Sequence, residues 1–334
     1  MEPEADTSAP ATGAARILDP RRPADRREVD RLRGDPLVEV DDRIGEQLGE
    51  LVLARAGDAS PTEEQVADAV ARHVGPGPVG EHGVWVHHPW SRRLVHLLDE
   101  DEVVELRLVH RAGLGPDEAT ARRGLVVGVA GDAAGPVAAT ALELVAGGVG
   151  ELRTLDPGAV TPADLGEGGL AVHHLGLPGA VAVARLVAEV DPFVATWCRE
   201  AGDGATLRRF LSGLDLVLDA SGGSAWSAEL AAACGARRVP LVRLAPGADA
   251  VDVVRFDLEP HRPAGPPPGG AGSHGSRGLG RAVAPVAVAL ALRILGGEAV
   301  PSGRVHLRAA PLRVVPTPVP DVPAAVATRG RRTR

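Results

Sequence analysis

The stretch LVVGVAGDAAGPVAATALELVAGGVGELRTLD at residues 125–156 decides the fold. It begins with a continuous apolar run that ends in glycines, which is typical of a buried parallel strand. A helix is predicted from Pro136 and ends at Gly147 and Gly148, because glycine often terminates helices. A second strand is predicted at 151–156. Strand, helix and strand in this order predict a βαβ unit with a right-handed crossover.

The same alternation continues downstream of this unit. Helical patterns separate apolar runs of strand length up to the C-terminal part of the chain. The predicted strands lie at 193–198, 214–220, 239–245, 251–256 and 304–309, and the predicted helices at 179–191, 207–213, 224–238 and 281–296. The chain is therefore predicted to be an α/β protein with a Rossmann-like, doubly wound, mostly parallel sheet.

Residues 16–112 are predicted to form an N-terminal accessory region of helical and mixed structure. A helix is expected to place Ile44, Leu48, Leu51 and Val52 on one face. The segment that follows the glycine-rich run GPGPVGEHG predicts a short strand, a turn at Pro89, a helix, and a strand near Val103–Leu108. Trp85 and Trp90 are expected at the junction between this region and the sheet.

The remaining boundaries follow from composition. Residues 1–15 and 316–334 are predicted to be disordered tails, because they are rich in proline and alanine and offer little to bury. The predicted nucleotide-binding domain spans 113–315, with a flexible Pro/Gly-rich loop at 260–280. No N-terminal secretion signal is visible, and the apolar stretch 283–295 is too short to span a bilayer, so a cytoplasmic location is expected.

Composition excludes some classes of function. The 334 residues are 44% hydrophobic and 24% charged, which favours a globular protein. A net charge of −8 and an aromatic content of 2% disfavour nucleic acid as a partner. All 36 basic residues are arginine, so no lysine exists to bind phosphate or form a Schiff base. The 2 cysteines cannot form a four-thiolate zinc site, so no zinc is expected.

The first strand–helix turn carries the candidate cofactor-binding glycines Gly128, Gly131 and Gly135. In a doubly wound sheet, ligands bind at the carboxyl ends of the strands, and glycines there let backbone amides approach a phosphate. The spacing is not G-x-G-x-x-G, and Asp132 would place a negative charge beside any phosphate. Two interpretations therefore stay open: a phosphate loop, or glycines that only permit a tight turn and close helix packing.

Two carboxylates complete the candidate cofactor site. Asp156 ends the second strand, where an acidic side chain accepts hydrogen bonds from ribose hydroxyls; the alternative is an aspartate that initiates the turn at Pro157. Asp219 ends the fourth strand, where it would hold Mg²⁺ through water, order a loop, or serve as a plain turn carboxylate. His173 and His174 have no further ligand at a clear spacing, so no metal site is predicted.

From Gly124 to Ala310 the sequence resembles the ThiF/MoeB/ubiquitin-activating-enzyme superfamily. The upstream block PWSRRLVHLLDEDEVVELRL resembles actinobacterial members of this superfamily. The residues that carry the resemblance are AGGVGELRTLDPGAVTPADL, HHLGLPGAVAVARLVAEVDPF, LDLVLDASGG and GLGRAVAPVAVALALRILGGEAVPSGRVHL. The resemblance implies a Rossmann-like domain that binds ATP and Mg²⁺ and adenylates the C-terminus of a small ubiquitin-like or sulfur-carrier protein, within a homodimer.

The departures from the family pattern fall on its catalytic groups. The family's phosphate-binding arginine aligns with Glu167, its lysine with Gly179, and its magnesium-associated aspartate with Gly222. The zinc and thioester cysteines of the family are missing. Because adenylation needs cations around the α-phosphate, the sequence predicts a degenerate, ATP-binding member with lost or reduced adenylation and no assigned catalytic residue. An NAD(P)- or FAD-binding oxidoreductase module and a noncatalytic dimeric interaction protein are the alternatives.

Overall fold

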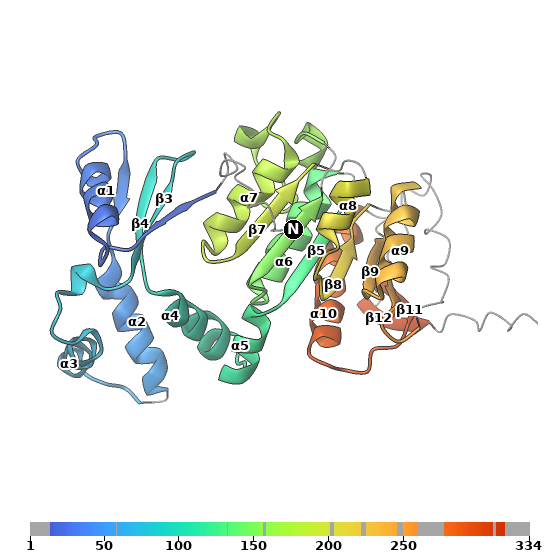
Figure 1. Cartoon of the computed structure of the whole chain (residues 1–334). Coiled ribbons are helices and arrows are strands. Elements are labelled where there is room, and N and C mark those ends of the chain that lie inside the picture. The colour runs from blue at the N-terminus through green and yellow to red at the C-terminus, as the bar shows by residue number, and fades with distance from the viewer. Residues whose placement is uncertain are drawn as a thin grey trace, which may run out of the picture.

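The computed structural model describes residues 14–57, 59–131, 133–155, 158–200, 204–221, 225–245, 250–259, 277–309 and 312–317. These residues form a small N-terminal sheet and a larger C-terminal sheet, each with its own helices (Figure 1). Helix α4 (Glu100–Val104), the π-helical segment η2 (Glu105–Arg111) and helix α5 (Pro116–Arg123) connect the two parts. The predicted tail 1–15 and loop 260–280 lie mostly outside the described residues.

The N-terminal sheet has four strands in the order β1-β3-β4-β2. Its strands are β1 (Arg16–Leu18), β2 (Glu39–Asp41), β3 (Val84–His88) and β4 (Arg93–Leu97). Its helices are α1 (Pro23–Arg33), α2 (Ile44–Ala56) and α3 (Glu63–Val74), followed by the 3₁₀ turn η1 (Val79–Glu81). The predicted apolar face of α2 is confirmed at Ile44, Leu48 and Leu51, which are buried.

Two predictions for residues 93–108 are wrong. Residues 93–97 form strand β4 rather than a helix, and their alternating burial has the period of two that a strand surface requires. Residues 100–111 are helical rather than extended. The acidic run before Val103 favours a helix start, and Glu102 Oε2 accepts a hydrogen bond from the Asp99 amide at 3.1 Å.

The C-terminal sheet has eight strands in the order β12-β11-β10-β9-β8-β5-β6-β7. The parallel strands are β5 (Val126–Ala130), β6 (Glu151–Leu155), β7 (Ala195–Arg199), β8 (Leu216–Asp219) and β9 (Leu241–Ala245). The last three, β10 (Ala250–Val254), β11 (Gly303–Ala309) and β12 (Leu312–Thr317), pair antiparallel. Only residues 246–249 separate β9 from β10, too few for the crossover that a parallel pair needs.

Helices cover both faces of this sheet. One core lies under α6 (Ala134–Ala146), α7 (Gly179–Val190) and α10 (Arg277–Leu295). The other lies under α8 (Gly204–Phe210) and α9 (Ala225–Arg237). The prediction of an α/β fold with a Rossmann-like, mostly parallel sheet is confirmed. Strand β5 pairs with β6 on one side and β8 on the other, so the order of strands reverses at β5.

Polar contacts join the N-terminal part to the end of α7. The Trp90 indole donates a hydrogen bond to Glu189 at 2.6 Å, and Asp191 accepts from Arg107 at 2.9 Å and from Arg123 at 3.1 Å. Trp90 therefore lies at the junction, as predicted. The prediction for Trp85 is wrong, because its 1%-exposed side chain packs inside the N-terminal core and stacks on His96. No helix of the described residues has the length and apolarity needed to cross a membrane.

Candidate nucleotide crevice

The candidate crevice lies where the carboxyl ends of β5, β6 and β8 meet. The Gly131 amide, just after β5, donates a hydrogen bond to the Leu155 carbonyl at the end of β6, at 3.0 Å. The Ala220 amide after β8 donates to the Ala130 carbonyl at 2.6 Å. Because the strand order reverses at β5, this edge is the position at which doubly wound sheets bind their ligands.

The three predicted glycines occupy different environments in the structure. Gly128 lies inside β5, where a Cβ would come within 2.6 Å of Leu214 and 2.7 Å of Phe210. At Gly131 a Cβ would come within 2.5 Å of Val137, the residue of α6 that packs over the turn. Both glycines thus have a packing reason to be glycine. Their role in binding a cofactor stays a prediction.

Gly135 lies in the first turn of α6, where backbone amides have no partner within the helix. Its amide donates to Asp164 Oδ1 at 2.9 Å, and this carboxylate is only 6% exposed. The other oxygen, Oδ2, accepts from the Thr161 amide at 2.8 Å and from the Thr161 hydroxyl at 2.7 Å. A carboxylate from the 161–170 loop therefore occupies the anion position at the N-terminus of α6.

These donors keep Asp164 ionised. Burial opposes the charge, but the hydrogen bonds from Thr161 and Gly135 outweigh burial and hold the pKa of this carboxyl below its ordinary value. The motif Thr161-Pro-Ala-Asp164 has the capping-box spacing that could have revealed this arrangement in the sequence. Asp164 is thus a residue of the candidate crevice that was not predicted from the sequence.

Glu167 belongs to the same loop and lies close to the same helix terminus. A Cβ on Gly135 would come within 2.9 Å of Glu167 Oε2 and 3.2 Å of Glu167 Cβ. Gly168 follows with a φ of +53°, and a Cβ there would overlap the backbone nitrogen of Ala139 in α6. The loop thus packs directly on α6, and two carboxylates, Asp164 and Glu167, lie beside its first turn.

Asp219 is fully buried at the end of β8. Its carboxylate accepts hydrogen bonds from the Ser221 amide at 3.0 Å, from the hydroxyls of Ser221 and Ser227, and from Arg243 Nε at 3.1 Å. Arg243 lies on β9 opposite Asp219 and is itself 2% exposed. Asp219 therefore joins Ser221, directly after β8, to Ser227 in the first turn of α9 and to Arg243 on β9. A role in binding Mg²⁺ stays a prediction.

The remaining candidate residues lie outside the described ranges or are buried with no sign of a catalytic role. Asp132, Asp156 and Gly222 lie outside the described residues. Cys198 and Cys234 are buried as free thiols, and burial raises the pKa of Cys234 to about 12, which disfavours a thiolate nucleophile. The Nδ1 atom of the buried His174 accepts a hydrogen bond from the Ala171 amide at 3.0 Å, so this histidine has a structural partner.

No protein-family model matches the chain. The uncharacterized protein MT1398 of Mycobacterium tuberculosis (strain CDC 1551 / Oshkosh) is 32% identical over 238 residues, which are 70% of this chain and 31% of that protein. The chain thus spans about a third of the length of this relative.

Solved structures of MccB have a similar fold. The microcin C7 biosynthetic enzyme MccB in complex with N-formylated MccA gives a TM-score of 0.51 at 9% identity, over 82% of this chain and 87% of that one. E. coli MccB with AMPCPP and selenomethionine-labelled MccA gives 0.50 at 10% identity, over the same shares. At these identities the likeness shows a shared fold, which is the Rossmann-like α/β fold described above.

Proposed function

We propose that this chain is a ThiF-type nucleotide-binding protein, related to enzymes that adenylate the C-terminus of ubiquitin-like or sulfur-carrier proteins, with lost or much reduced adenylation. The reversal of strand order at β5 supports a nucleotide crevice at this edge. The fold likeness to MccB, which has been solved with AMPCPP and MccA, supports ATP as the ligand and a small protein or peptide as the partner.

The observation that carries the proposal is the pair of carboxylates at the N-terminus of α6. Helix N-termini of this kind bind phosphate because their amides and dipole favour an anion. Here the Gly135 amide is taken by Asp164, and Glu167 lies beside it. A triphosphate would have to displace or approach these negative charges, so phosphate binding is opposed where a catalyst needs to strengthen it.

One buried arginine next to β8 is committed to a carboxylate, and two positions at which the resemblance places cations hold other residues. Arg243, the buried arginine of β9, forms an ion pair with Asp219 at 3.1 Å. Glu167 and Gly179 stand where the resemblance places an arginine and a lysine. Loss of one donor that stabilises transition-state charge costs about 2.7–4 kcal/mol of barrier. Loss of two therefore predicts a rate lower by several powers of ten.

The test combines ligand binding with turnover on the full chain. Thermal-shift and calorimetric titrations would compare ATP, AMP, NAD and FAD, and pyrophosphate exchange into ATP would be measured with a small protein or peptide present. We expect AMP to bind at least as tightly as ATP, with no appreciable exchange. Tighter ATP than AMP binding together with rapid exchange would contradict lost activity, and preferential stabilisation by NAD or FAD would contradict the function itself.

A charge variant sharpens this experiment. Glu167→Gln removes one negative charge near the phosphates and keeps the shape of the side chain. We expect it to tighten ATP binding several-fold and to leave AMP binding nearly unchanged, because the extra phosphates carry most of the repulsion. Glu298→Gln, at an exposed ion pair with Arg293, is the matched control and should change neither affinity. Equal changes of ATP affinity in the two variants would show that the charge of Glu167 does not oppose phosphate binding.

A further inference from the structure

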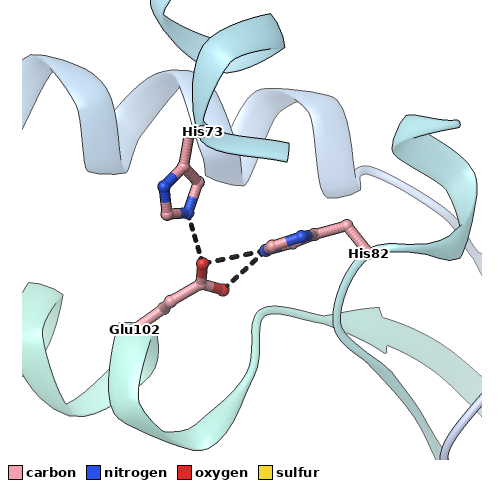
Figure 2. A group of neighbouring side chains, drawn as sticks. All are labelled: His73, His82 and Glu102. Carbon is pink, nitrogen blue, oxygen red and sulfur yellow. Dashed lines mark hydrogen bonds and ion pairs between the residues drawn. The ribbon is translucent and has the colours of Figure 1, made fainter. Parts of the chain in front are cut away.

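Three potential metal ligands come together in the N-terminal region, away from the nucleotide crevice (Figure 2). His73 lies in the last turn of α3, His82 directly follows η1, and Glu102 belongs to α4. Their ligand atoms all lie within 4.8 Å of one another. This group does not stand out in the sequence, because its members are separated by irregular spacings and lie on three different elements.

Both imidazole rings direct their Nε2 atoms at the carboxylate of Glu102. His73 Nε2 lies 2.5 Å from Glu102 Oε1, and His82 Nε2 lies 2.8 Å from Oε1 and 2.9 Å from Oε2. The two rings meet edge to face, with centroids 5.4 Å apart. Figure 2 shows the rings approaching the carboxylate from two sides. The Glu102 side chain is only 10% exposed, and that of His73 is 25% exposed.

We propose that His73, His82 and Glu102 bind one divalent transition-metal ion of the zinc class. Two imidazole nitrogens and one carboxylate oxygen form a donor set that suits zinc, and three protein ligands leave a fourth position for water. Metal–ligand distances of about 2.0–2.1 Å place tetrahedral ligand atoms roughly 3.3 Å apart. The two contacts between imidazole nitrogen and carboxylate oxygen are shorter, at 2.5 and 2.8 Å, so each ring needs to retract from Glu102 by less than about 1 Å to admit the ion.

The surroundings of the three residues favour a cation and also impose one rearrangement. Glu102 lies within the acidic segment 99–105, DEDEVVE. Arg55 Nη1 lies 3.2 Å from His73 Nδ1, and arginine only donates, so Nδ1 accepts and Nε2 carries the proton in the metal-free protein. A metal on Nε2 moves this proton to Nδ1, and Arg55 must then withdraw. Its bidentate contact with Glu105, at 2.7 and 2.6 Å, gives it a second anchor.

A bound ion would connect three separate elements of the N-terminal region, α3, α4 and the residue that follows η1. Helix α3 has no fully buried residue among its twelve, Glu63–Val74, and packs against the core beside α2 through the partly buried Val70 and Val74. His73 and Arg55 also line an open cavity of about 630 Å³ between α2 and α3, so one side of the His73 ring faces solvent. A metal ion would tie the end of α3 to α4 and the η1 turn, and so stabilise the folded N-terminal region.

The experiment titrates the full chain, purified without a histidine tag, with Zn²⁺ by calorimetry and thermal shift. We expect one equivalent to bind and to raise the melting temperature, because an ion that binds only the folded state stabilises it. Bound Co²⁺ should give the visible absorption bands of a four-coordinate site, with three protein ligands and one water. Glu102→Gln and His82→Gln should each weaken zinc binding at least about tenfold. His173→Gln, an exposed histidine of the other region, is the control and should bind as the parent does.

The comparison of variants separates a metal site from a purely hydrogen-bonded group. Glu102→Gln also alters the cap of α4, so the zinc-induced change is the readout rather than the melting temperature itself. His82→Gln leaves that cap intact. Substoichiometric zinc binding by the parent, or zinc affinities in both variants equal to that of the parent, would overturn the proposal. This outcome would leave the nucleotide proposal untouched, since the two sites share no residue.

Discussion

The two sheets of this protein bury charged side chains with different kinds of partner. In the C-terminal sheet, Asp219 is fully buried beside a guanidinium, and Asp164 is held by backbone amides and a hydroxyl. In the N-terminal part, buried Glu102 and His96 have imidazole or carboxylate partners, at His73, His82 and Asp42. Amides and guanidinium groups keep their protons at any working pH, whereas imidazoles exchange protons and bind metals. The buried carboxylates of the C-terminal part thus pair with groups that keep their protons, whereas Glu102 pairs with two groups that are also potential metal ligands.

The largest effect is expected from breaking the fixed pair of the C-terminal sheet. Asp219→Ala leaves Arg243 buried without its carboxylate, and removing one partner of a buried pair costs about 3–5 kcal/mol. Urea unfolding followed by circular dichroism measures this loss. Glu298→Ala breaks the exposed pair with Arg293 and should cost less than about 1 kcal/mol. Similar losses for the two variants would show that burial does not distinguish these pairs.

A smaller effect is expected where the 161–170 loop packs on α6. Gly168→Ala adds a methyl group against the backbone of Ala138 and Ala139, at a positive φ. Gly176 also has a positive φ, of +80°, but open space around it, so Gly176→Ala isolates the cost of conformation. We expect Gly168→Ala to lose roughly 1–3 kcal/mol more than Gly176→Ala, the usual cost of overpacking. Equal unfolding free energies would mean that the loop can move away from α6.

The smallest effect concerns the cap of α6. Asp164→Asn weakens the hydrogen bonds to Thr161 and Gly135 and should cost about 0.5–2 kcal/mol at neutral pH. The pKa of Asp164 is lowered in the folded protein, so its ionised form stabilises the fold above the unfolded value of about 3.9. This contribution is lost as the pH falls below about 4, through the folded pKa.

Stability measured against pH checks the assignment of this cap. The difference in unfolding free energy between the parent and Asp164→Asn should shrink from pH 6 toward pH 2. Protonation of Asp164 over this range removes the charge that stabilises the parent. A difference that stays constant over this range would show that the carboxylate charge contributes nothing at the helix terminus.

Much of the C-terminal sheet was predictable because β5, β8 and β9 are short, mostly apolar runs and helical patterns separate the strands from β5 to β9. Residues 93–97 were not, because RLVHL is too short to distinguish a period of two from a helical pattern. The direction of the strand at 251–256 was left open, although so short a gap after β9 allows only an antiparallel pairing, as β10 shows. Of the candidate crevice, the glycines were visible, but the contact of Asp164 with Gly135 depends on a loop that returns across α6.

Helix α7 extends from the candidate crevice of the C-terminal sheet to the N-terminal part of the molecule. At its N-terminal end, the Gly179 amide donates a hydrogen bond to the Gly158 carbonyl beside the crevice. At its C-terminal end, Asp191 accepts hydrogen bonds from Arg107 and Arg123, which lie on the segments that connect the two parts. Twelve residues of helix span about 18 Å as one stiff rod. A displacement of the N-terminal part would therefore be transmitted by a single helix to Gly158, in the segment that follows β6.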